Sequence, residues 1–165
     1  MEWILVSLAS ALAGFVDAIV GGGGLILVPA MFAAFPTTTP ATLFGTNKSA
    51  AVWGTAISAW QYSHRVRITW VTLVPAIGTT LVGAFLGAWA VTLIKPDFLR
   101  ILLPFILLGV LLYTLAKKEL GRDHAPRLTG RTEMWAASAI GLLIGFYDGF
   151  FGPGTGSFFV FLFVR

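Results

Sequence analysis

The chain consists of long apolar runs separated by short polar or glycine- and proline-rich breaks. From Trp3 to Asn47, a run of 45 residues, Asp17 is the only charged residue, and the 26 residues from Thr69 to Ile94 contain none. About 20 apolar residues suffice for a helix to cross the hydrocarbon of a bilayer. The runs are rich in Leu, Ala and Gly and do not alternate with a period of two, so the pattern predicts membrane helices rather than a barrel.

Five long apolar segments and two shorter pieces make up the predicted architecture. The expected segments are 3–20, a short 25–35, 41–62, 68–94, 98–116, 133–151 and a short 157–164. The break at Gly21–Gly24 follows from the low helix propensity of glycine. Segments 3–20 and 25–35 together are too long for one straight span and too short for two, which predicts a broken or re-entrant helix. The fold class is therefore all-α, a polytopic transmembrane helix bundle of about five to six hydrophobic segments.

Composition supports a membrane protein, with the lipid bilayer as its first partner. Hydrophobic residues make up 57% of the 165 residues and charged residues only 11%, whereas a soluble domain carries about a quarter charged residues. The net charge of +4 comes mostly from short loops, which argues against nucleic acid as a partner. Cysteine is absent and the two histidines lie far apart in the sequence, so neither a metal site nor a cofactor is expected.

Loop charges predict the topology. The loops at 64–67 and 117–131 are separated by two spans, so they lie on the same side of the membrane. Their basic residues are Arg65, Arg67, Lys117, Lys118, Arg122, Arg127 and Arg131. The opposite side, near 95–100, holds only Lys95 and Arg100. Because basic residues in short loops favour the cytoplasmic side, both loops are predicted to be cytoplasmic in a multi-pass protein of the cytoplasmic membrane.

An internal repeat appears at an offset of 131 residues. The segment 14–23, GFVDAIVGGG, matches 145–154, GFYDGFFGPG, so that Asp17 aligns with Asp148. Corresponding interrupted hydrophobic segments in two halves indicate the binding site of a secondary transporter. The organisation predicted is a first transmembrane repeat at 1–116, a cytoplasmic basic loop at 117–132 and an incomplete second repeat at 133–165. No second copy of 35–116 follows, so we expect a C-terminally truncated chain.

These motifs resemble the sulfite exporter TauE/SafE family. The first, GFVDAIVGGGGLI at 14–26, is followed by Pro29 and by GTNK at 45–48, and the second is GFYDGFFGPGTGS at 145–157. The resemblance covers essentially the whole chain. It implies a membrane permease that moves sulfite, sulfonates and related organic anions across the cytoplasmic membrane.

The two glycine breaks are the first candidate substrate-binding elements. The residues concerned are Gly21, Gly22, Gly23, Gly24, Gly152, Gly154, Thr155 and Gly156. A break exposes backbone N–H groups, and the half-helix that follows presents its positive end, which suits an oxyanion. The alternative is close helix packing through small residues, which is the preferred interpretation for the GxxxG pairs Gly83–Gly87 and Gly141–Gly145.

Charged residues within the membrane segments complete the candidate site. Lys48, beside Asn47 and Ser49, is predicted to bind the anion, with snorkelling to the interface as the alternative. Asp17 and Asp148 are predicted either to carry protons for coupled transport or to fix the broken helices. The alternative for these carboxylates is to cap a neighbouring backbone or to pair with Lys48.

An enzyme is not expected, because no GxxxxGK[ST] phosphate loop and no buried histidine beside a nucleophile occur in the sequence. The leading hypothesis is a secondary permease for a small sulfur-containing or organic anion. The alternatives are a non-transporting membrane fragment, a subunit that needs another chain to complete the site, and a homo-oligomer.

Overall fold

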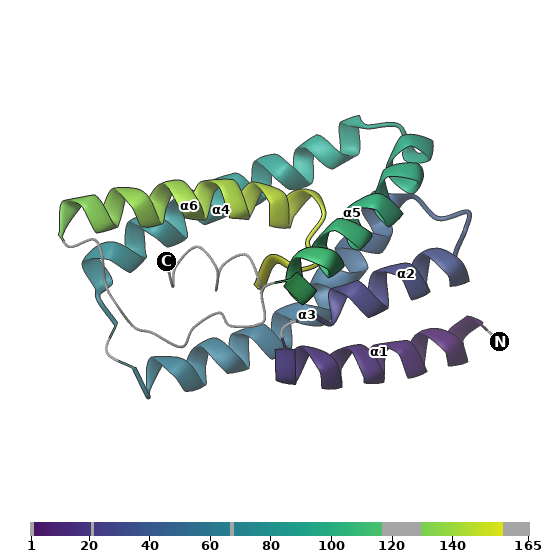
Figure 1. Ribbon diagram of the computed structural model, residues 1–165, viewed down its shortest axis with the longest axis horizontal. Coiled ribbons are helices and arrows are strands. Elements are labelled where there is room, and N and C mark those ends of the chain that lie inside the picture. Colours follow the sequence, from purple (N-terminus) through teal and green to yellow (C-terminus); the bar gives the residue numbers. More distant parts are fainter. Residues whose placement is uncertain (1, 21, 67, 117–129, 157–165) are drawn as a thin grey trace.

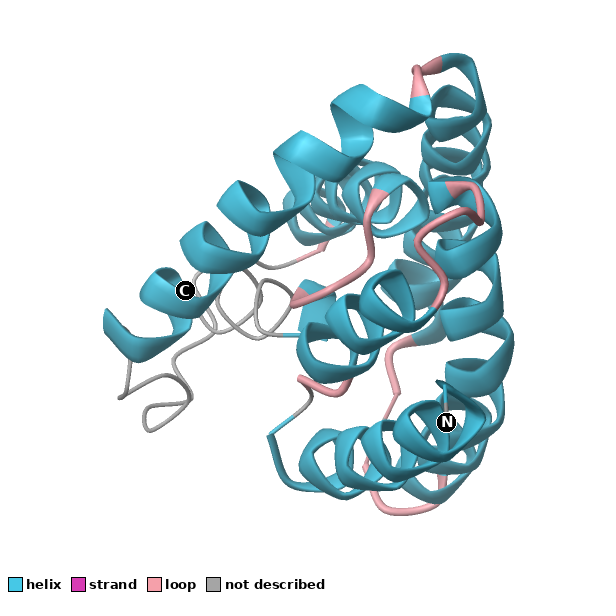
Figure 2. Ribbon diagram, turned by 90° about the vertical axis from the view of Figure 1, so that its right-hand side faces the viewer, coloured by secondary structure: helices cyan, strands magenta, loops and turns pink. Residues whose placement is uncertain are grey.

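The computed structural model describes residues 2–20, 22–66, 68–116 and 130–156, and this part of the chain is an all-helical bundle without strands (Figures 1 and 2). Its helices are α1 (Glu2–Val20), α2 (Gly24–Ala34), α3 (Pro40–Ser63), α4 (Trp70–Leu93), α5 (Pro96–Ala116) and α6 (Arg131–Phe150). Each predicted segment among them agrees within about two residues at either end, the usual uncertainty of helix ends. The predicted piece 157–164 and most of the loop 117–132 lie outside the described residues.

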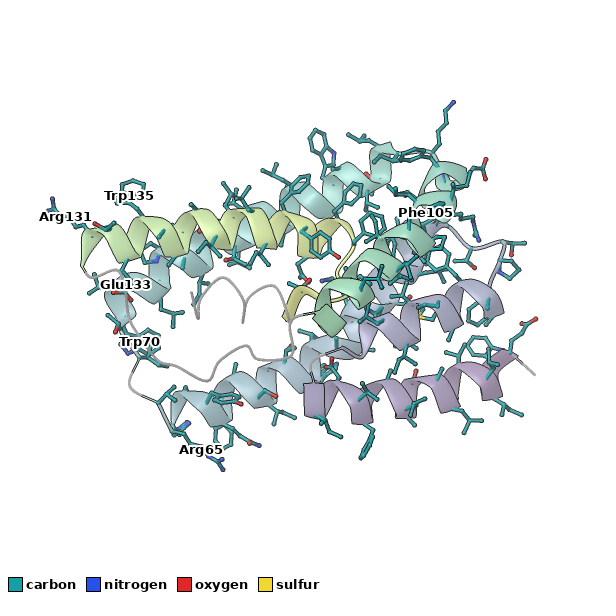
Figure 3. The ribbon with its side chains drawn as sticks, in the orientation of Figure 1. Arg65, Trp70, Phe105, Arg131, Glu133 and Trp135 are labelled. Atoms are coloured by element: carbon teal, nitrogen blue, oxygen red, sulfur yellow. The ribbon has the colours of Figure 1, made fainter. Side chains whose placement is uncertain are left out.

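The bundle turns its apolar side chains outwards, as expected of helices in lipid. Among the described residues, two helical stretches are long and apolar enough to span a membrane, Glu2–Ile19 with mean hydropathy 1.6 and Trp70–Leu93 with 1.8. Only 6% and 17% of these stretches are buried, whereas the core helix of a soluble protein is mostly buried. The fold is a membrane helix bundle, and Figure 3 places Trp70 and Trp135 at one end of it, the position of interfacial anchors.

The first break produces a hairpin of two helices. α1 and α2 lie side by side and run in opposite directions (Figure 1). Ala13 of α1 packs with Leu27 and Met31 of α2, and all three residues are buried. Thr39 then caps α3, with Pro40 in the first turn, the position that tolerates proline.

Glycines bring α4 and α6 into direct backbone contact. The two helices run parallel, and their contact is the most extensive between any two helices in the described part. A Cβ added at Gly83 or Gly87 would collide with the backbone of α6, and one at Gly145 or Gly149 with the backbone of α4. The packing interpretation of the GxxxG pairs is confirmed.

This contact makes a stability prediction with a matched control on the same helix. Gly83→Ala should destabilise the protein by about 1–3 kcal/mol, because the added methyl group must push α4 and α6 apart. Gly78→Ala should be neutral or stabilising by up to about 1 kcal/mol, since no atom of the described residues lies within 4 Å of a Cβ added at Gly78 and alanine favours helix. Denaturant unfolding in detergent micelles measures both, and equal effects of the two variants would contradict the contact.

Candidate functional site

The two helix breaks meet inside the bundle. α1 and α6 run in opposite directions, and each breaks near the middle of the bundle (Figure 1). A Cβ on Gly24, at the start of α2, would lie 3.4 Å from the Cα of Pro153, in the second break. The two sequence motifs therefore occupy one place in the fold, although 131 residues separate them.

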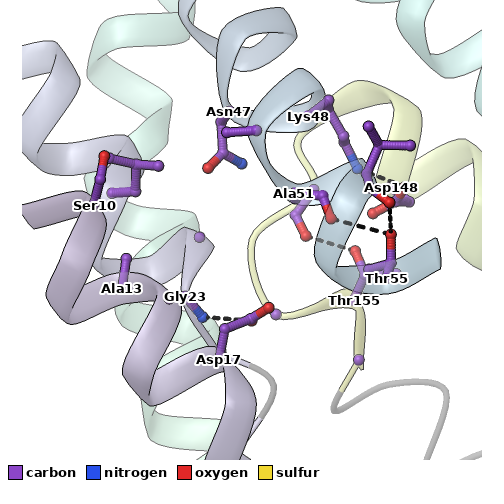
Figure 4. A pocket seen from close by; sticks show the side chains of 18 residues that line it. Ser10, Ala13, Asp17, Gly23, Asn47, Lys48, Ala51, Thr55, Asp148 and Thr155 are labelled. Carbon is purple, nitrogen blue, oxygen red and sulfur yellow. Dashed lines mark hydrogen bonds and ion pairs between the residues drawn. The ribbon is translucent and has the colours of Figure 1, made fainter. Parts of the chain in front are cut away.

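A cavity of about 620 Å³ opens at this meeting point (Figure 4). Most of the predicted site residues line it: Asp17, Gly23, Gly24, Asn47, Lys48, Asp148, Gly152, Gly154, Thr155 and Gly156. Gly22 lies in the first break without lining the cavity, and Gly21 lies outside the described residues. The tertiary structure thus gathers residues of α1, α2, α3, α6 and the second break around one space.

The carboxylate of Asp17 fixes the first break. Its Oδ1 accepts a hydrogen bond of 2.8 Å from the backbone N–H of Gly23 (Figure 4). The amides of Leu25 and Ile26 donate to the carbonyl groups of Gly22 and Gly23. A negative charge is favourable at the N-terminus of a helix, so Asp17 already supplies the anion that α2 attracts. The expectation of bare amides at the first break is wrong for these donors.

The carboxylate of Asp148 takes a different partner from its repeat counterpart. Asp148 Oδ2 lies 2.5 Å from the Nζ of Lys48, and the two side chains are 34% and 37% exposed. Lys48 comes from α3 and turns its ammonium group into the cavity (Figure 4). The pair links α3 to the end of α6.

Gly152 makes room for the ammonium group. Its φ is +84°, a backbone conformation that glycine adopts most readily. A Cβ at this position would lie 2.8 Å from the Nζ of Lys48. The backbone conformation therefore favours glycine here, and a larger residue would also displace the ammonium group of Lys48.

The rest of the second break is held by its own hydrogen bonds. Thr155 donates from Oγ1 to the carbonyl of Gly152 at 2.6 Å, and its backbone N–H donates to the same oxygen at 3.3 Å. The hydroxyl of Tyr147 donates to the carbonyl of Pro153 at 2.8 Å. The break is a defined turn at the base of the cavity.

Sequence reasoning missed part of the cavity wall. Ser10 and Gly14 on α1, and Ala51 and Thr55 on α3, line the cavity as well. Residues three, four and seven apart share one face of a helix. Gly14 and Ser10 lie three and seven residues before Asp17, and Ala51 and Thr55 lie three and seven residues after Lys48. This spacing is the signal in the sequence that indicates all four positions.

The chain belongs to the sulfite exporter TauE/SafE family, whose model matches residues 6–165. It is 39% identical over 157 residues to the probable membrane transporter protein ORF9 of a Sinorhizobium species, covering 94% of this chain and 58% of that relative. It is 38% identical over 154 residues to the probable membrane transporter protein YfcA of Escherichia coli K12, covering 93% of this chain and 55% of the relative.

A probable membrane transporter protein of Haemophilus influenzae is 38% identical over 159 residues, which covers 88% of this chain and 55% of that protein. The chain thus spans little more than half the length of these curated relatives. No solved structure matches it.

The hydrogen bond of Asp17 generates a prediction about the first break. Asp17→Ala should destabilise the protein by about 1–2 kcal/mol, because it removes a charged cap from α2. Asp17→Asn should lose less, since the amide oxygen still accepts from Gly23. Hydrogen exchange in detergent should show faster exchange at the start of α2 for Asp17→Ala, and unchanged exchange there would contradict the cap.

Proposed function

We propose that this protein acts in a secondary permease of the cytoplasmic membrane that binds a small anion in the cavity between the two helix breaks. The observation that carries the proposal is the convergence of both breaks on Lys48 in one cavity. Helix breaks at corresponding places in two repeats are a general feature of substrate sites in such transporters. Family membership and relatives named probable membrane transporter proteins support the same function.

The proposed substrate is a small sulfur-containing or organic anion such as sulfite or a sulfonate. The hydroxyl groups of Thr55 and Thr155 donate to backbone carbonyl groups, so the donors proposed for the anion are the ammonium group of Lys48 and the amide group of Asn47 on the cavity wall. An oxyanion with several acceptor oxygens satisfies donors of this kind. The cavity volume of about 620 Å³ has room for a small anion together with water.

The two carboxylates take separate roles in the proposal. Asp17 is a structural cap, engaged by Gly23. Asp148 competes with the substrate for Lys48, because both would approach the same ammonium group. When a proton binds to the Asp148 carboxylate, the ammonium group is released to the anion. One proton then enters the site with each anion bound, and a monoanion would move with a proton as a neutral pair.

For the topology we propose a multi-pass arrangement with the loops 64–67 and 117–131 in the cytoplasm. Arg65 and Arg131 lie at the same end of the bundle (Figure 3), as expected if α3 and α6 meet the membrane surface on one side. The positive-inside rule then selects the cytoplasmic side for this end.

Flux measurements test the role of Lys48. The purified protein in liposomes should take up radiolabelled sulfite or a sulfonate, and Lys48→Ala should lower uptake at least tenfold by removing the charge that binds the anion. Lys95→Ala is the control, since Lys95 is exposed in the α4–α5 turn, away from the cavity residues.

Equal uptake by wild type and Lys48→Ala would remove Lys48 from the mechanism. If wild type binds the anion but moves none, the alternative of a subunit that needs a completing chain is favoured. If wild type neither binds nor moves these anions, the proposed substrate class is wrong.

The competition between Asp148 and the anion gives a second test. Asp148→Asn should tighten anion binding at neutral pH several-fold, because Lys48 no longer has a carboxylate partner. Its binding should also lose the increase towards acid pH that we expect of wild type. Isothermal titration in detergent at several pH values measures both effects. Weaker binding by Asp148→Asn, or an unchanged pH profile, would contradict the proposed proton carrier.

A further inference from the structure

We infer that an exposed row on α1, formed by Ser10, Gly14 and Ala18, is a docking surface for a second membrane helix of the same kind as α4. The occupant is the counterpart of α4 in a second repeat. It is an apolar helix with small residues at four-residue spacing that runs parallel to α1. We call Ser10, Gly14 and Ala18 the α1 row.

The internal repeat sets the correspondence. The offset of 131 that aligns Asp17 with Asp148 also aligns the α1 row with Gly141, Gly145 and Gly149 of α6. Small residues thus occupy the same three positions of both helices. Both helices also end at a break within three residues of their aspartate, so the correspondence extends from sequence to backbone.

On α6 these positions are in use as a helix contact. The contact includes Gly141 against Ala76, Gly145 against Thr80, and Gly149 against Ala84 of α4, so closely that a Cβ on any of the three would strike α4. The numbers increase together along both helices, so the contact is parallel. Thr79 Oγ1 adds a hydrogen bond of 2.8 Å to the carbonyl of Ser138. The positions of α6 that match the α1 row therefore pack against α4.

On α1 the same positions are open. All three residues of the α1 row are exposed, and a Cβ on Gly14 would meet nothing within 4 Å in the described part of the chain. The neighbouring Phe15 is 67% exposed, whereas its counterpart Phe146, which contacts α4, is 43% exposed. The difference is the one expected if α1 lacks a neighbour that α6 has.

Lipid and a second copy of the chain fit the α1 row less well than an α4-type helix does. In a bilayer, small residues favour helix association because they allow backbones to approach closely and pack. The small-residue face of α4 is already covered by α6, so a second copy could offer it only by opening its own bundle. The curated relatives contain additional length outside the matched region.

Docking would also complete the cavity. Ser10 and Gly14 line the cavity as well as belonging to the α1 row. A helix seated on the row would therefore stand at the edge of the site and form part of its wall. The inference rests on the repeat and on the α4–α6 contact, and not on transport.

Disulfide mapping tests the inference, because the chain contains no cysteine. Three single-cysteine variants of the full chain, Ser10→Cys, Gly14→Cys and Ala18→Cys, are each reconstituted in liposomes. The probe is a synthetic peptide of residues 70–93 with a single substitution, Ala76→Cys, Thr80→Cys or Ala84→Cys. We expect the pairs 10–76, 14–80 and 18–84 to cross-link under mild oxidation.

The controls use the same cysteines in the wrong register. The swapped pairs 10–84 and 18–76 should cross-link at least fivefold less than the matched pairs, since a parallel helix separates them by about two turns. Gly109→Cys on α5 gives the background with each peptide, since a Cβ at Gly109 also meets nothing within 4 Å among the residues that the structure describes. Adding Gly14→Leu to the 10–76 pair should lower its yield at least fivefold, whereas Gly109→Leu should not.

Three outcomes would overturn the inference. Equal yields for matched and swapped pairs would show contact without the predicted register. If the matched pairs cross-link no more than Gly109→Cys does, the α1 row faces lipid and binds no helix of the α4 kind. Efficient dimers of Gly14→Cys in the absence of peptide would assign the row to a second copy of α1.

Discussion

The arrangement of this bundle depends on the backbone contact between α4 and α6. Apolar helices gain little from burying side chains against each other in lipid, because the lipid is equally apolar, so close packing must hold them. Gly83 and Gly87 on α4, with Gly145 and Gly149 on α6, permit that approach. The contact anchors α6, which ends beside the first break and presents Asp148 to Lys48. The cavity is therefore a consequence of glycines that do not line it as much as of the residues that do.

Two aspartates that are equivalent in sequence have different partners in the fold. Asp17 accepts from Gly23, six residues further along the chain, while Asp148 pairs with Lys48 from another helix. Inverted repeats of transporters surround one site from opposite sides, and alternating access moves one repeat against the other around it. The two aspartates therefore lie in different local environments.

Much of the fold followed from pattern alone. In lipid the backbone groups must be satisfied in helices or closed barrels, and apolar runs without a period-two alternation favour helices. The ends of α1 to α6 agree with the predicted segments. The break before Gly24 followed from the helix propensity of glycine. The small-residue spacing of Gly83 and Gly87 predicted packing. It did not say which helix would be the partner, because any apolar helix with a small-residue face satisfies the same pattern.

For the site, the sequence by itself determined which chemistry is present: two membrane-embedded carboxylates, one lysine and two repeat-related breaks. Only the tertiary structure decided that these features share one cavity, that Lys48 pairs with Asp148 rather than with Asp17, and that Gly23 is capped. The reason is physical. Helix formation and membrane insertion depend on residues close together in the chain, whereas an ion pair between Lys48 and a residue 100 positions away depends on how the helices between them pack.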